Sequence, residues 1–128
     1  MKFIRFSVAQ RDPRTGQAAG VITLAYNLLR DGAIDPGHET ALREHIHWLE
    51  RHLPVPDRFT RTRNASQRNT HGLSWLKDSA VESVRRLRAV AEVIRQHGHA
   101  VDMCVTARPG YVVYEDDFQV VAEPFHGQ

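Results

Sequence analysis

The chain has 128 residues, a hydrophobic share of 41%, a charged share of 25% and a formal net charge of +2 at pH 7. These values are typical of a soluble globular protein, and the length predicts one domain over residues 1–128 with a core of its own. The single cysteine, Cys104, excludes an intrachain disulfide and a cysteine-based zinc cluster, and it indicates a reducing compartment.

The N-terminal residues favour a cytoplasmic protein. They alternate apolar and polar side chains and lack the continuous apolar core of a secretory signal. No apolar run approaches the roughly 20 residues that a membrane-spanning helix needs. We therefore expect a soluble, cytoplasmic protein with no membrane partner.

Residues 2–9 predict the first strand. Ile4, Phe6 and Val8 fall on one side of an alternating pattern, which is the period of a half-buried strand. Turn-forming residues with proline and glycine follow this segment.

Residues 17–31 predict a helix that ends at Gly32. The β-branched run at 21–23 favours a strand, but the length and the wider spacing of apolar residues favour a helix. The residues of the expected helical face are Val21, Leu24, Ala25, Leu28 and Leu29.

A second helix is expected to begin at Pro36, with Asp35 as its N-cap. Pro54 and Pro56 would stop it, since proline cannot continue a helix. Its inner stripe is formed by Leu42, Ile46, Leu49 and Leu53.

Residues 57–73 form a long segment without clean periodicity, rich in Arg, Asn, Ser and Thr. Loops of this length are uncommon in compact domains and are usually functional or disordered. This segment is therefore the first place to look for a binding surface.

Residues 74–98 predict one long amphipathic helix. Ser74 is a plausible N-cap, and Gly98 stands where a left-handed C-cap residue is expected. Apolar residues recur at spacings of three and four and predict a buried stripe. That stripe consists of Leu76, Ala80, Val84, Leu87, Ala91 and Ile94.

Three short strands are expected at residues 100–107, 111–114 and 118–123. Arg108, Pro109 and Gly110 predict a type II turn between the first two. The predicted order is β-α-α-α-β-β-β. The fold class is then α+β, a two-layer sandwich in which three helices cover a four-stranded, mainly antiparallel sheet that the first strand joins.

Histidines and acidic residues give no metal prediction. His38, His45 and His52 recur every seven residues, a step of about 10 Å that is too long for one shared ion. His97 and His99 have no third ligand near in sequence. The acidic run at 115–117 fits a solvated turn better than a hard-cation site. We expect no metal ion and no cofactor.

Catalytic motifs are also missing from the sequence. Cys104 lies in the middle of a predicted strand, where an unreactive thiol is the common case. There is no Gly-rich phosphate loop, HExxH motif or nucleophile elbow. The sequence predicts no catalytic residue and favours a protein that is not an enzyme.

The best positive signal is a basic cluster. Arginine forks suit phosphate and carboxylate groups, and an indole ring offers a stacking face. An alternative is that the cluster docks on the acidic hairpin of its own chain. The predicted binding residues are Arg58, Arg61, Arg63, Arg68, Trp75 and Lys77.

Three blocks of the second half, LPVPDRF at 53–59, SWLKDSA at 74–80 and RPGYVVYEDDFQVVAEPF at 108–125, resemble a family of small bacterial proteins of unknown function. The resemblance implies no activity, substrate or cofactor. The three blocks fall on the entrance of the basic loop, the first turns of the predicted long helix and the last hairpin. If those three segments meet in space, they define one surface.

These observations predict a small non-catalytic binding or regulatory module. It would contact a protein partner or an anionic ligand through the basic loop 57–73 and the adjacent helix start. Two alternatives stay open: a nucleic-acid-binding protein that uses the arginine-rich loop, and an enzyme with an unrecognised site acting on a phosphorylated substrate. Affinity that falls steeply with salt would favour nucleic acid.

Overall fold

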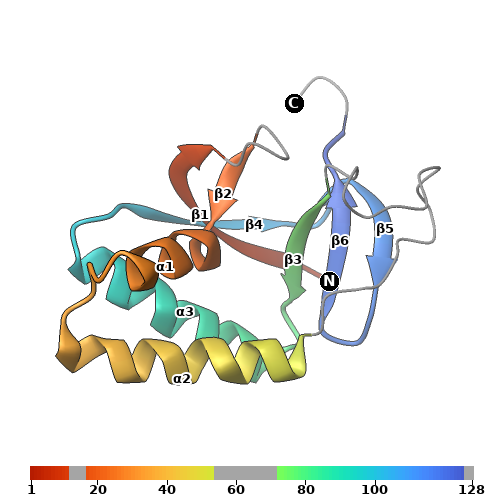
Figure 1. Ribbon diagram of the computed structural model, residues 1–128. Coiled ribbons are helices and arrows are strands. Elements are labelled where there is room, and N and C mark those ends of the chain that lie inside the picture. Colours follow the sequence, from red (N-terminus) through yellow and green to blue (C-terminus); the bar gives the residue numbers. More distant parts are fainter. Residues whose placement is uncertain (12–16, 54–71, 126–128) are drawn as a thin grey trace.

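The computed structural model describes residues 1–11, 17–53 and 72–125, and this part of the chain has three helices and six strands (Figure 1). The α+β class is confirmed, but the predicted order and strand number are wrong. The elements are β1 (Phe3–Arg11), β2 (Ala18–Gly20), α1 (Val21–Arg30), α2 (Pro36–His52), β3 (Leu73–Lys77), α3 (Val81–Gln96), β4 (Val101–Thr106), β5 (Tyr111–Glu115) and β6 (Gln119–Glu123).

Strand β1 is the centre of an antiparallel sheet. One of its edges pairs with β4 from Phe3 to Val8, while the other edge pairs with β3 near its start and with β2 near its end. Strand β6 then links β3 to β5. The first strand joins the sheet as expected, but it lies between β4 and β3, while β5 pairs with β6.

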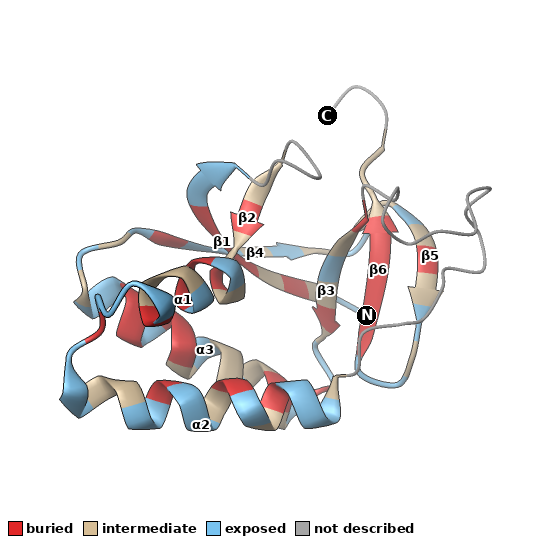
Figure 2. Cartoon of the chain, in the orientation of Figure 1, coloured by how far each residue is buried: buried red, intermediate tan, exposed pale blue. Residues whose placement is uncertain are grey.

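The helices lie together along β1 and β4, whereas β3, β6 and β5 extend beyond them (Figure 1). The buried sides of α1, α2 and α3 face one another and the sheet (Figure 2). Among the described helices, none is long and apolar enough to cross a membrane. The main core includes Phe6, Val8, Leu24, Ala25, Leu42, Ile46, Val90, Ala91 and Ile94.

Helix α2 begins where the sequence predicts. Asp35 is its N-cap, and its side chain accepts a hydrogen bond from the backbone N–H of His38 at 3.1 Å. Pro36 occupies the first turn, where a missing N–H costs nothing. The predicted residues Leu42, Ile46 and Leu49 are buried, so the sequence signals for this element agree with one another.

The predicted helix over 74–98 is wrong in its first turns. Ser74 is not an N-cap: it lies in β3 opposite Val121, and α3 begins at Val81. Leu76 is buried as expected, but in a strand, where it lies opposite Ile4 of β1. Pairing with both β1 and β6 satisfies the backbone of this segment, and that outweighs a helical spacing of apolar residues.

Within α3 the predicted stripe is only partly correct. Ala91 and Ile94 are fully buried, and Ala80 is buried just before the helix. Val84 and Leu87 are half-buried at the margin of the core. The buried residues of α3 are therefore concentrated in its C-terminal half, where Val90 and Val93 are also buried.

The predicted helix over 17–31 is likewise shortened. Ala18–Gly20 form strand β2 against the end of β1, and the helix starts at Val21. Gly32 follows it with a φ of +68°, as expected for a residue that ends a helix. The β-branched run at 21–23 is therefore helical, and the strand lies just before it at residues that gave no strand signal.

Gly110 has a φ of +142°, well beyond the roughly +80° of a type II turn, so the predicted turn type is wrong. Its need for glycine has another cause. A Cβ at this position would lie 2.2 Å from the carbonyl oxygen of Glu123. The strands β5 and β6 approach each other too closely there for any side chain.

Candidate functional site

The structure describes two of the six predicted binding residues. Trp75 and Lys77 lie in β3, not at the start of a helix as expected. The four arginines fall within residues 54–71, as does most of the predicted loop 57–73, and these lie outside the described residues. Arg58, Arg61, Arg63 and Arg68 therefore stay predictions.

Trp75 and Lys77 share the face of β3 that points away from the helices. Side chains alternate along a strand, and Leu76 between them lies opposite Ile4 on the helix-covered face. Across the sheet, Trp75 is opposite Val120, which is in turn opposite Glu115 of β5. These three residues form a row over β3, β6 and β5, which we call the outer face.

Lys77 is held by this row. Its Nζ lies 2.6 Å from Oε2 of Glu115, and its side chain is 12% exposed. The pair spans β6 and joins β3 to β5. The sequence left open whether the basic cluster docks on the acidic hairpin of its own chain. Lys77 makes such a contact, so its charge already has a partner.

Trp75 is in the opposite situation. Its indole nitrogen Nε1 is buried and has no hydrogen-bond partner among the described residues. A buried donor without an acceptor costs about 1–3 kcal/mol, so such groups are nearly always paired. An acceptor brought to the outer face would recover that energy.

Asp116 in the hairpin is a turn former. Its Oδ1 accepts from the backbone N–H groups of Phe118 and Gln119 at 2.8 and 2.9 Å, and Oδ2 accepts from the hydroxyl of Tyr114 at 2.9 Å. Burial opposes the charge of Asp116, but these hydrogen bonds outweigh it and lower the pKa. The carboxylate of Asp116 is therefore occupied by hydrogen bonds within the hairpin.

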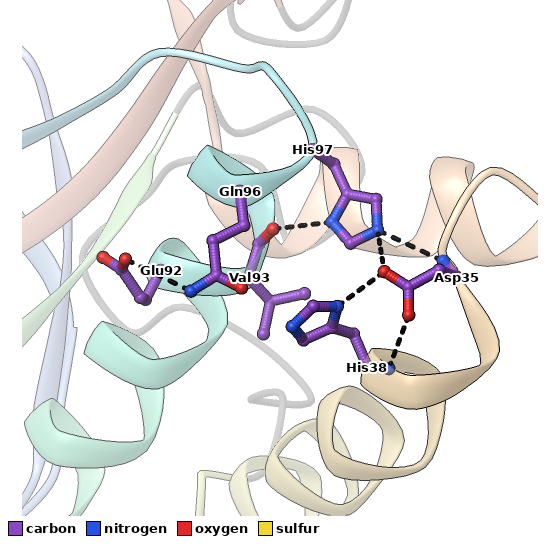
Figure 3. Close-up of polar contacts among 6 residues, drawn as sticks. All are labelled: Asp35, His38, Glu92, Val93, Gln96 and His97. Atoms are coloured by element: carbon purple, nitrogen blue, oxygen red, sulfur yellow. Dashed lines mark hydrogen bonds and ion pairs between the residues drawn. The ribbon is translucent and has the colours of Figure 1, made fainter.

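The structure also brings together three residues that the sequence did not connect: Asp35, His38 and His97 (Figure 3). Oδ2 of Asp35 lies 2.6 Å from Nδ1 of His38 and 3.1 Å from Nε2 of His97. The hydrogen bond from His38 is the main cause of a lowered pKa at Asp35. We call these residues the Asp-His-His cluster.

The cluster joins the start of α2 to the end of α3, two segments 62 residues apart. The sequence already places Asp35 and His38 close together, because Asp35 is the predicted N-cap and His38 follows it by three residues in the first turn. His97 was grouped there with His99 because no other ligand was near in sequence. Only the antiparallel packing of α2 on α3 supplies the missing residue.

Other histidines have local structural contacts. Nδ1 of His45 lies 3.3 Å from Nη1 of Arg86 on α3, and burial followed by the charge of Arg86 lowers the pKa of His45. His52 stacks on Trp48 with ring centroids 3.9 Å apart. The contact of His45 with Arg86 helps to hold α2 against α3, whereas the stack of His52 on Trp48 lies within α2.

Comparison of the chain with family models, with curated proteins and with solved structures found no significant match in any of the three. The resemblance of the three sequence blocks to small bacterial proteins therefore stays a prediction.

Proposed function

We propose that the protein is a small non-catalytic binding module that receives an anionic group, from a ligand or from a protein partner, at the outer face of β3. Trp75 and the arginines of residues 57–73 are its proposed contacts. The observation that carries the proposal is the buried Nε1 of Trp75, which has no acceptor among the described residues.

The chemistry of the indole defines what fits. Its N–H is a donor only, so the group that satisfies it must be an acceptor such as a phosphate, carboxylate or carbonyl oxygen. Arg68 is seven residues before Trp75 in the sequence, and a chain of that length reaches at most about 24 Å. Guanidinium groups within that radius would favour the anionic acceptors, which they bind in bidentate fashion.

Lys77 has a supporting function in this proposal. Its ion pair with Glu115 fixes β3 against β5 and neutralises one carboxylate of the hairpin. An approaching anion would then meet the basic residues without repulsion from Glu115. Nucleic acid and a phosphorylated substrate remain the alternative sources of the anionic group.

The test is a binding titration with heparin as the anionic probe, at low salt, on the wild type and two matched variants. Trp75→Phe keeps an aromatic ring but removes the N–H together with part of the bicyclic ring system. Trp48→Phe makes the same change on α2, where the ring stacks on His52. We expect Trp75→Phe to weaken binding at least about threefold, since one hydrogen bond contributes about 1 kcal/mol, and Trp48→Phe to leave it unchanged. Equal affinities for the wild type and Trp75→Phe would refute the assignment of Trp75.

A further inference from the structure

We infer that the Asp-His-His cluster is a binding site for a divalent transition-metal ion. Asp35, His38 and His97 each offer one ligand atom, and these three atoms lie within 4.8 Å of one another. Figure 3 shows both imidazole rings directed at the carboxylate of Asp35. This site is separate from the outer face and does not depend on the proposed anion binding.

The orientation of His97 is the strongest argument. Its Nδ1 donates to the backbone carbonyl of Val93 at 2.8 Å, and its Nε2 accepts from the backbone N–H of Asp35 at 3.1 Å. The Val93 contact fixes the tautomer and leaves the lone pair of Nε2 on the side of the carboxylate. Metal-binding histidines almost always have such a carbonyl or carboxylate behind them.

His97 is also held in place, whereas its two partners can adjust. Its side chain is 14% exposed, against 40% for His38 and 52% for Asp35. Tetrahedral zinc with bonds of about 2.0–2.2 Å places its donors about 3.3 Å apart. Small rotations of Asp35 and His38 around a fixed His97 would bring the three ligand atoms to that spacing.

The donor set selects the class of ion. Two imidazole nitrogens and one carboxylate oxygen suit zinc and its neighbours, while calcium and magnesium prefer sites made of oxygen alone. Exposure of Asp35 and His38 leaves room for water as the fourth ligand. A three-ligand site of this kind is the open form of a zinc site.

Electrostatics at the two helix ends partly offset each other. His97 is the C-cap of α3, whose negative end favours a cation. Asp35 caps the positive end of α2, which disfavours a cation. The carboxylate of Asp35 offsets this, because it would place a full negative charge next to the ion. Metal binding would replace the hydrogen bond from the backbone N–H of Asp35 to Nε2 of His97. The N–H of Asp35 would then donate to water.

The test is a Zn²⁺ titration of the metal-free full chain in competition with a chromophoric chelator. We expect one ion per chain, and no displacement by Mg²⁺ or Ca²⁺ at millimolar concentration. His97→Ala and Asp35→Asn should each weaken Zn²⁺ binding by at least about 100-fold, because each removes one of three ligands. His47→Ala is the matched control, since His47 is exposed on the same helix as His38 and is not in the cluster; it should change the affinity less than twofold.

Asp35→Asn keeps the experiment informative if His97→Ala fails to fold. Asparagine caps a helix as well as aspartate does, so α2 should form normally, as circular dichroism would verify. Co²⁺ gives a second readout: the wild type should show the intense visible absorption of a four-coordinate ion, and Asp35→Asn should lose it. Absence of 1:1 binding, or equal Zn²⁺ affinity in the wild type and Asp35→Asn, would overturn the inference.

Discussion

Gly110 occupies a position that only glycine fits. Its positive φ is a conformation that side chains rarely adopt, and the carbonyl of Glu123 occupies the space where a Cβ would lie. The sequence predicted the glycine requirement from turn chemistry, whereas its cause is a close approach between two strands. A correct residue prediction can therefore rest on an incorrect structural reason.

Replacing Gly110 by valine should destabilise the protein more than replacing Pro109 by alanine. The valine would add strain of order 1–3 kcal/mol from the positive φ, and the backbone clash would increase it further. Pro109→Ala removes only a restriction on the unfolded chain. Urea melts of both variants measure the two free energies of unfolding, and the reverse order would mean that β5 and β6 do not approach closely at Gly110.

At the level of elements, prediction succeeded where several local signals coincide. Helix α2 has an N-cap, a proline in its first turn and a regular apolar stripe, and it forms where expected. Strand β2 has only three residues, too few to show an alternating pattern. Strand β3 is stabilised by β1 and β6, which are far away in sequence and which local patterns do not contain. Leu76 and Ala80 have helical spacing by coincidence, since Leu76 lies in β3 and Ala80 is the N-cap residue of α3.

Core substitutions in α3 should follow burial and not the apolar pattern. Ile94 is fully buried, so Ile94→Ala should cost about 2–5 kcal/mol of unfolding free energy. Leu87 is half-buried at the margin of the core, so Leu87→Ala should cost clearly less. Chemical denaturation of the two variants compares them directly. An equal or larger cost for Leu87 would show that α3 is rotated from the register described.

At the scale of the whole molecule, the sheet and the helix layer place functional residues that the sequence cannot pair. The antiparallel packing of α2 and α3 brings His97 to Asp35, and the strand order β3-β6-β5 brings Lys77 to Glu115. Both contacts join segments distant in sequence. The sequence did identify Trp75 and Lys77 as candidates, because residue type and neighbouring charge are local properties.

The central claim is that the basic residues at 57–73 and Trp75 receive an external anion. Its most direct measurement is heparin affinity as a function of salt, for the wild type and for a variant with Arg58, Arg61, Arg63 and Arg68 replaced by Gln. We predict that the wild type binds at low salt and loses affinity steeply as salt rises, because bound counterions are released on binding. The variant should lose binding with its melting temperature nearly unchanged. A wild type that binds no polyanion at low salt, or a variant that loses stability but not binding, would contradict the claim.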